Sequence, residues 1–274
     1  MEKFTITFAE DKSLRDYLLS CCPTEGREIT TEEKGNVRIT LTCSRALFRA
    51  LIADAITVYY KTKIVRKALP QGKDDLLFFA YLGAVVGEDL SAEREGVEKL
   101  IPADIDVNLN GIFRFLLTEY DHLWRALGEL AGKLLTASSD EPDVYALIRY
   151  FLSNGGTTKR TLIVDKTIYY DDTNEDVPCL SVSDSMEKDV AFNLLLRRPQ
   201  EIILPFPKKY SDELLSLIGK LGEEYYTLFL PNKREKANGN FLFLSAVLWV
   251  KPLTNDYILW YYIYYVMIKG RNFF

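Results

Sequence analysis

The stretch from Asp106 to Phe151 constrains the fold of this chain more than any other part of the sequence. Apolar residues recur in it at helical spacing, so the pattern predicts a long amphipathic helix that Asn108 or Asn110 can cap at its start. The predicted apolar stripe comprises Ile112, Phe113, Leu116, Leu117, Tyr120, Leu123, Trp124, Leu127, Leu130, Ala131 and Leu134. The predicted polar side comprises Arg114, Glu119, Asp121, Arg125 and Glu129. We expect the N-terminal half of the chain to pack on one edge of this helix and the C-terminal half on the other.

The residues before this helix predict a small unit of strands and helices. Alternating apolar residues favour strands, and apolar residues at helical spacing favour helices. Pro70-Gln71-Gly72 is expected to end the longest of these helices. The predicted elements are a strand at Lys3–Ala9, a helix at Leu14–Ser20 capped by Ser13, a hairpin of Arg27–Thr31 with Asn36–Thr42, a helix at Ser44–Leu69, a fully buried helix at Asp74–Val86 and a polar helix at Ser91–Lys99. The β-α-β-β unit that begins this series buries little alone and needs the helix after it.

The residues after Leu152 predict a second set of strands and helices. The predicted elements are a hairpin of Thr161–Tyr170 with Val177–Val182 around the turn DDTNED, a helix at Met186–Arg197 capped by Ser185, a strand at Glu201–Leu204, a helix at Asp212–Leu221 capped by Ser211 and a strand at Tyr226–Leu230. Strand, helix and strand in this order imply a small parallel element. The whole pattern predicts an α+β fold with segments at 1–72, 73–152, 153–230 and 231–274: an N-terminal α/β unit, a helical middle, a C-terminal α/β unit and a tail.

The distribution of charge separates the last segment from the rest. The net charge of −5 argues against a dedicated nucleic-acid binder, which usually carries a basic surplus. From Pro231 onward, six Lys/Arg against two Asp/Glu give the tail +4, which leaves −9 for residues 1–230. Eleven of the 35 aromatic residues lie between Phe241 and Phe274. The two apolar runs of this tail are shorter than the roughly 20 residues of a membrane-spanning helix, so we expect none.

Several sequence blocks are similar to one known family. They are AITVYYKTKIVRKAL, NGIFRFLLTEYDHLW, LIRYF, TLIVDKTIYYDDTNEDV, DVAFNLLLRRPQEIIL and ELLSLIGKLGEEYYTLF. In order and spacing they resemble the YtxC-like putative sporulation proteins of endospore-forming bacteria, over most of residues 1–230. The resemblance implies a sporulation-linked bacterial protein of undefined biochemical activity, and it supplies no catalytic residue. The chain departs from the family after Leu230, where the resemblance implies a cysteine-containing end; either a natural variation or a shifted reading frame explains this.

The cysteines and the single histidine are the first candidates for a chemical site. Cys21 and Cys22 are adjacent, whereas a metal or redox site favours C-x-x-C spacing with further ligands, so with Cys43 and Cys179 they are expected to be small buried thiols. The absence of an apolar N-terminal run and the few cysteines indicate a reducing, cytoplasmic compartment. His122 could act as a general base, but it lies opposite the apolar stripe and is expected to be an exposed helix residue.

Charged clusters supply the remaining candidates. Carboxylates that could hold a hard cation are Asp171, Asp172, Asp176, Asp184, Glu187 and Asp189, although they lack EF-hand spacing and are expected to form a solvated turn. Side chains that could hold an anion are Arg197, Arg198, Lys208 and Lys209, the last pair beside a helix N-terminus in LPFPKKYSDE. The pair Gly155-Gly156 matches no nucleotide motif. The sequence therefore assigns no catalytic, cofactor-binding or metal-binding residue.

These observations favour a non-enzymatic, cytoplasmic protein that acts in sporulation through contacts with a protein partner. Two other classes stay open. A peripheral membrane protein would use Lys233, Arg234 and Lys236 together with the aromatic tail at a membrane surface. A metal-dependent hydrolase or anion-binding enzyme would use the clusters of charged residues.

Overall fold

The structure is a computed structural model that describes residues 1–22, 27–32, 35–102, 104–138, 140–154, 158–225, 227–231, 235–237, 240–242, 244–247 and 262–265. The fold is α+β, as the sequence predicts. The chain divides into two compact units. Unit 1 contains Met1–Gly156 and Pro178–Arg198, and unit 2 contains Thr157–Val177 and Pro199–Phe274.

Unit 1 contains a four-stranded sheet in the order β2-β3-β1-β4. Its strands are β1 (Glu2–Ala9), β2 (Arg27–Glu32), β3 (Asn36–Cys43) and β4 (Asp106–Asn108). The predicted hairpin of β2 with β3 is confirmed, and β1 pairs antiparallel with β3 so that Ile6 lies opposite Ile39, both fully buried. The alternating apolar residues of β1 and β3 therefore form the inner face of this sheet. The short strand β4, which runs parallel to β1, was not predicted.

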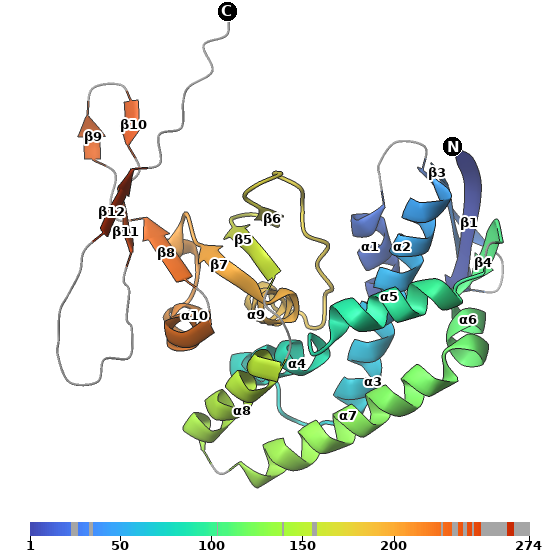
Figure 1. Ribbon diagram of the computed structural model, residues 1–274, viewed down its shortest axis with the longest axis horizontal. Helices are drawn as coiled ribbons and strands as arrows, with labels where there is room; N and C mark the ends of the chain where they lie inside the picture. Colours follow the sequence, from blue (N-terminus) through green and yellow to red (C-terminus); the bar gives the residue numbers. More distant parts are fainter. Residues whose placement is uncertain are drawn as a thin grey trace, which may run out of the picture. The chain divides into compact units, whose positions relative to one another are not determined.

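Two helical segments alternate with the strands of this sheet: one follows β1, and a longer one follows β3 (Figure 1). Helix α1 (Lys12–Cys21) is capped by Asp11, whose Oδ1 accepts from the Leu14 amide at 3.2 Å, so the predicted Ser13 cap is wrong. The predicted helix from Ser44 to Leu69 is a continuous helical segment made of α2 (Arg45–Ala55), the π-helical turn η1 (Ile56–Tyr60) and α3 (Lys61–Ala68). The extra residue of a π turn shifts the side chains that follow around the helix.

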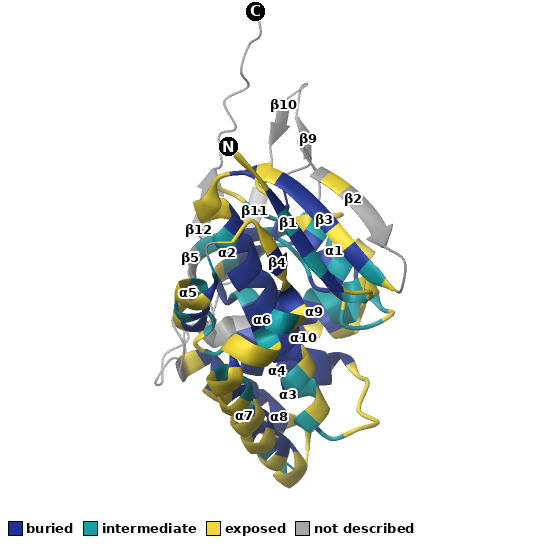
Figure 2. Ribbon diagram, turned by 90° about the vertical axis from the view of Figure 1, so that its right-hand side faces the viewer, coloured by how far each residue is buried: buried dark blue, intermediate teal, exposed yellow. Residues whose placement is uncertain are grey.

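Helices α4 (Leu76–Val86) and α9 (Met186–Arg197) cross closely within unit 1. Helix α4 is buried on nearly all sides, as its apolar sequence predicts. A Cβ added at Gly83 would lie 2.3 Å from the backbone oxygen of Phe192, so only glycine permits this approach. The other helices of this unit are α5 (Leu90–Leu100), α6 (Leu109–Leu116), α7 (Thr118–Ala137) and α8 (Glu141–Asn154). Figure 2 shows the buried interior of α2 and α4 against the largely exposed surface of α7.

The predicted helix after Asn108 is two helices. Asn108 caps α6 as predicted, since its Oδ1 accepts from the Gly111 amide at 2.9 Å. The backbone leaves helical geometry at Leu117 (φ −116°, ψ 28°), and α7 starts at the next residue. Leu116, Leu123 and Leu130 of the predicted buried stripe are 45%, 54% and 49% exposed, so burial of the whole stripe is wrong. The buried side of α7 comprises Trp124 and Ala131 of that stripe together with Gly128, Gly132 and Leu135.

Unit 2 contains a six-stranded sheet in the order β12-β11-β8-β7-β5-β6. Its elements are β5 (Thr158–Val164), β6 (Ile168–Tyr170), β7 (Pro199–Ile203), the 3-10 turn η2 (Pro207–Lys209), α10 (Asp212–Tyr225), β8 (Thr227–Pro231), β11 (Leu244–Val247) and β12 (Tyr262–Tyr265). The predicted parallel strand–helix–strand element is confirmed by β7, α10 and β8. Ser211 caps α10 as predicted, with 3.2 Å from the Leu214 amide to its hydroxyl.

The predicted turn at DDTNED is present, but the long hairpin predicted around it is wrong. Strands β5 and β6 pair with each other, so the chain turns at Asp165–Thr167 inside the segment predicted as one strand. The predicted partner strand at 177–182 has no strand structure; the isolated bridge of Tyr169 with Asp176 is all that continues the pairing there.

Part of the predicted tail carries strands. β11 pairs antiparallel with β8 and with β12, and β9 (Glu235–Ala237) pairs with β10 (Asn240–Leu242).

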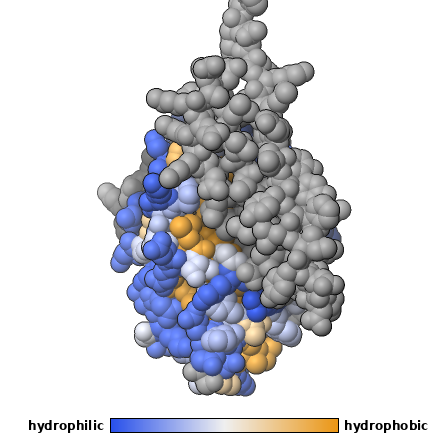
Figure 3. All heavy atoms as spheres, turned by 90° about the vertical axis from the view of Figure 1, so that its left-hand side faces the viewer, coloured by the Kyte–Doolittle hydropathy of each residue, from blue (hydrophilic) through white to orange (hydrophobic). Residues whose placement is uncertain are grey.

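Across the helices that the structure describes, none has the length and apolarity needed to cross a membrane. On the face drawn in Figure 3, hydrophilic side chains predominate among the coloured residues.

The two units divide the chain differently from the four predicted segments. Residues 1–72 and 73–152 both fall in unit 1. Within residues 153–230, the segment Pro178–Arg198 also belongs to unit 1, and the residues on either side of it belong to unit 2.

Candidate protein-binding groove

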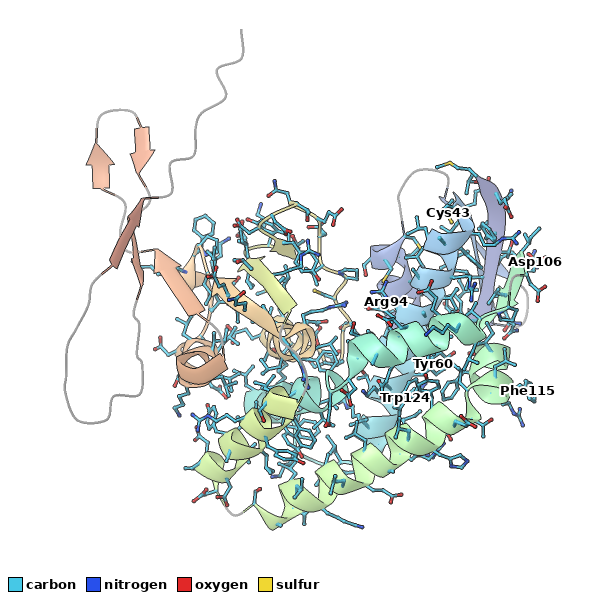
Figure 4. The ribbon with its side chains drawn as sticks, viewed as in Figure 1. Cys43, Tyr60, Arg94, Asp106, Phe115 and Trp124 are labelled. Carbon is cyan, nitrogen blue, oxygen red and sulfur yellow. The ribbon has the colours of Figure 1, made fainter. Side chains whose placement is uncertain are left out.

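A groove of about 420 Å³ lies in unit 1, where the π turn η1 meets α6 and the first turns of α7. It is lined by Tyr60, Asn110, Phe113, Arg114, Thr118, Asp121 and Arg125. This volume falls within the range of small-molecule sites, and the lining consists of two aromatic and five polar or charged side chains. Figure 4 shows Tyr60 and Trp124 between α5 and α7, and Phe115 at the outer side of α6.

Aromatic side chains form one wall of the groove. The Tyr60 ring stacks on the Phe113 ring at 4.3 Å between centroids, and Phe113 lies parallel to Trp124 at 6.4 Å. The Tyr60 hydroxyl donates to Asn110 Oδ1 at 2.7 Å, which fixes the ring from its polar end. Burial raises the pKa of Tyr60, so its hydroxyl stays a neutral donor at physiological pH. Tyr60 is 8% exposed and Phe113 is partly buried, so this wall offers a small apolar surface to a bound group.

Charged side chains form the other wall. Arg125 donates to both carboxylate oxygens of Asp121, at 2.8 and 3.0 Å, and these hydrogen bonds raise the pKa of Arg125. The guanidinium of Arg114 lies over the Phe115 ring, 5.6 Å from its centroid. Because Asp121 is engaged by Arg125, Arg114 gives this wall a cationic character suited to an anionic group.

A buried ion pair fixes the position of Trp124, whose ring lies parallel to that of the groove residue Phe113. The Lys61 ammonium lies 2.6 Å from Glu93 Oε2 and donates to the Glu88 carbonyl at 2.6 Å. Trp124 Nε1 donates to the other Glu93 oxygen at 3.0 Å, so the pair holds the indole that backs Phe113. Burial lowers the pKa of Lys61, and the charge of Glu93 opposes this shift. Lys61 is the first residue after the π turn, which therefore positions both Tyr60 and the ion pair.

The predicted anion-binding arginines are engaged inside unit 1. Arg197 donates to the Tyr17 hydroxyl at 3.1 Å and to the Pro178 carbonyl at 2.8 Å, and it lies 3.9 Å from Asp54. Arg198 is 5% exposed and donates to the carbonyls of Ala84 and Phe151 at 3.0 and 2.9 Å. Burial, followed by the charge of Asp54, raises the pKa of Tyr17 well above its usual value. These contacts tie helices of unit 1 together and leave neither arginine open to a ligand.

The other sequence candidates occupy ordinary structural positions. Among the residues that the structure describes, His, Cys, Asp and Glu side chains form no group of three or more that could hold a metal ion. Cys22 and Cys43 are buried, and Cys21 and Cys179 are partly buried. His122 is exposed on α7, as predicted.

The predicted acidic cluster is divided between the units. Asp171, Asp172 and Asp176 are exposed in unit 2, where Arg160 lies 2.9 Å from Asp172. Asp184, Glu187 and Asp189 belong to unit 1, where Asp189 accepts from the amides of residues 182 and 183 at 2.9 Å each. Asp189 therefore organises the loop before α9.

Lys208 and Lys209, the last predicted anion site, lie in the 3-10 turn η2. Lys209 lies 2.7 Å from Asp165 and 4.4 Å from the Phe206 ring centroid, and Lys208 is exposed. Gly155, Gly156, Lys233 and Arg234 lie outside the described residues, and Lys236 lies in β9.

The groove itself was not predicted from the sequence. Its residues divide between the predicted apolar stripe (Phe113) and the predicted polar side (Arg114, Asp121, Arg125), and the missed signal is that aromatic and basic residues alternate where α6 meets α7. None of the seven described lining residues is a histidine or cysteine, and the Asp121 carboxylate is paired with Arg125. The lining therefore suits binding better than proton transfer.

Comparisons with known proteins add no relative: the chain matches no family model, no curated protein and no solved structure. The resemblance of its sequence blocks to the YtxC-like family stays a prediction.

Proposed function

We propose that this chain is a non-enzymatic, cytoplasmic protein of sporulation that acts by binding a segment of another protein in the groove of unit 1. The observation that supports the proposal is that the stacked pair Tyr60–Phe113 and the cationic side chain of Arg114 line the same open groove. The sporulation setting is supported by the sequence resemblance alone.

The chemistry of the groove defines the segment that it would bind. The aromatic wall fits a flat or branched apolar side chain, which gains by leaving water. Arg114 fits a carboxylate close to that side chain, and the Asn110 amide fits a backbone carbonyl. The proposed ligand is therefore a short peptide segment with Asp or Glu beside Phe, Trp or Leu.

A binding assay with defined peptides tests this proposal. Fluorescent peptides that carry an acidic residue beside an aromatic or leucine residue are titrated with the full chain, and lysine replaces the acidic residue in the control peptides. We expect Arg114→Glu to weaken binding about tenfold or more, since it turns an attraction into a repulsion. The matched protein control is Lys12→Glu, the same charge change at an exposed position at the start of α1.

Binding that ignores the acidic residue, or equal effects of Arg114→Glu and Lys12→Glu, would contradict the assignment of the groove. The sporulation setting has its own test, in which the gene is deleted and heat-resistant spores are counted. An unchanged spore count would remove that part of the proposal and leave the binding result intact.

A further inference from the structure

Helix α7 carries an apolar seam that unit 1 buries only in part. Tyr120, Leu123, Leu127, Leu130 and Leu134 follow one another at alternating spacings of three and four residues. Leu123 and Leu130 are 54% and 49% exposed, and the other three are partly buried. Three-four spacing is the pattern of a helix that packs along another helix. Phe115, near the end of α6, is 74% exposed, and Figure 4 shows it at the outer side of that helix.

The seam is separate from the proposed binding groove. At about 100° per residue, the α7 residues that line the groove lie on the opposite side of the helix from Leu123 and Leu130. The buried side, centred on Trp124 and Ala131, lies between the two surfaces. Around the axis of α7, apolar residues therefore cover about twice the arc of helix surface that packs inside unit 1. Exposed apolar patches of this kind mark interaction sites.

A row of residues beside the seam indicates what covers it. Glu119, Ala126 and Lys133 lie seven residues apart, so they share one flank of the seam, and all three are exposed. An acidic residue stands near one end, a small residue in the middle and a basic residue near the other end. This order is complementary to itself when reversed, which is the property that an antiparallel pair of identical helices needs.

We propose that α7 pairs antiparallel with α7 of a second copy of this chain, about a twofold axis close to Arg125 and Ala126. Glu119 then faces Lys133 of the partner subunit, and Lys133 faces Glu119 of the partner subunit. The two Ala126 side chains meet near the axis and let the helices approach closely. In a parallel pair, Glu119 and Lys133 would lie about 21 Å apart along the axis, at 1.5 Å per residue, and would not meet.

The same register gives four of the five seam residues an apolar partner within α7. Leu123 packs against Leu127 of the partner subunit, Leu130 packs against Tyr120 of the partner subunit, and the twofold axis repeats both pairs. Helix α7 has 20 residues, so the paired length is about 30 Å. One twofold rotation therefore brings opposite charges together and apolar residues together. This self-complementarity is the reason to assign a second copy as the occupant.

Sedimentation equilibrium of the full chain tests the pairing. We expect a reversible dimer whose dissociation constant rises at least about tenfold, or which becomes a monomer, when Leu123→Glu and Leu130→Glu are combined, because both charges would enter the apolar seam. Leu47→Glu is the matched control, since Leu47 is another exposed helix leucine, 40% exposed, that lies in α2. Far-UV circular dichroism establishes that each variant keeps its helices.

Charge reversal tests the orientation. Glu119→Lys or Lys133→Glu alone should weaken the dimer about tenfold, because symmetry doubles each repulsion, and the two together should restore it. A chain that is monomeric at every concentration, or a dimer unaffected by the seam variants, would overturn the proposal. Single reversals that weaken the dimer without recovery in the double variant would also overturn it. Peptide binding depends on the other side of α7, so either proposal can fail while the other stands.

Discussion

Lys61 illustrates, at the scale of one residue, how unit 1 combines polar and apolar groups in its interior. Its side chain is fully buried, and its ammonium lies 2.6 Å from a Glu93 oxygen while it also donates to the Glu88 carbonyl. A buried charge is tolerated only when it is paired, because the low polarity of the interior penalises an isolated ion. The Trp124 indole satisfies the second oxygen of Glu93, so the pair joins α3, α5 and α7.

Removal of the lysine charge should destabilise the chain strongly. Lys61→Met keeps the length of the side chain but leaves the Glu93 carboxylate buried without its cation, which costs about 3–5 kcal/mol. Urea denaturation followed by circular dichroism measures this loss. Combining Lys61→Met with Glu93→Gln should recover a large part of it, because a neutral amide can still accept from Trp124. A cost below about 1 kcal/mol for Lys61→Met, with no recovery in the double variant, would argue against the pairing.

At the scale of elements, pairs of glycines four residues apart set how closely the helices of unit 1 approach. Gly83 and Gly87 lie against the backbone of α9, and Gly128 and Gly132 lie against Val65 and Ala68 near the end of α3. A Cβ at Gly132 would lie 2.7 Å from the Ala68 carbonyl oxygen. Side chains on these faces would separate the helices, so glycine is required for contact and not for backbone conformation.

An alanine series measures this requirement. Gly83→Ala should destabilise unit 1 more than Gly132→Ala, because the added Cβ would lie 2.3 Å rather than 2.7 Å from a backbone oxygen. We expect losses of about 1–3 kcal/mol, as for other overpacked positions. Gly111→Ala in α6 is the control: its Cβ would meet ordinary contacts at 3.5 Å, so helix propensity should make it neutral or stabilising by up to about 1 kcal/mol. Equal effects at all three positions in thermal denaturation would contradict the packing argument.

The elements also show which parts of the structure the sequence can predict. Periodicity and caps are local signals, so they identified β1, the β2–β3 hairpin, the buried helix α4, the Asn108 and Ser211 caps and the β7-α10-β8 element. The break at Leu117, the π turn and the three-residue strand β4 depend on contacts with distant residues, which a single sequence does not display. The groove was missed for the same reason, because Tyr60 and Phe113 come from separate helical segments.

Local pattern also failed where it was ambiguous. The run TLIVDKTIYY alternates well enough for one strand, yet it folds as two strands with a turn at its centre. The burial predicted for the apolar stripe of α7 was correct at Trp124 and Ala131 and wrong at Leu123 and Leu130, because a helical pattern does not distinguish an internal from an external partner. The exposed leucines Leu123 and Leu130 belong to the seam that we propose to pair with a second copy.

At the scale of the whole molecule, the two units are interleaved along the chain. Helix α9 belongs to unit 1, although the strands that precede and follow it in sequence belong to unit 2. The helix supplies the backbone that packs on Gly83 and Arg197, which binds Tyr17, and the next residue, Arg198, binds Ala84 and Phe151. Unit 1 therefore cannot complete its core until the chain has been made beyond residue 198.

Two truncations test this interleaving. A fragment of residues 1–198 keeps every segment of unit 1, with residues 157–177 as a loop whose closure costs little free energy. A fragment of residues 1–156 lacks α9 and exposes the apolar face of α4, which is buried on nearly all sides in the full chain. We expect the longer fragment to unfold cooperatively in urea, and the shorter one to bind a hydrophobic dye and unfold gradually, as partly packed states do. Cooperative unfolding of both fragments with similar midpoints would show that α9 is not an essential part of unit 1. A longer fragment that also fails to fold would place the requirement in unit 2, since residues 199–274 would then be all that distinguishes it from the intact chain.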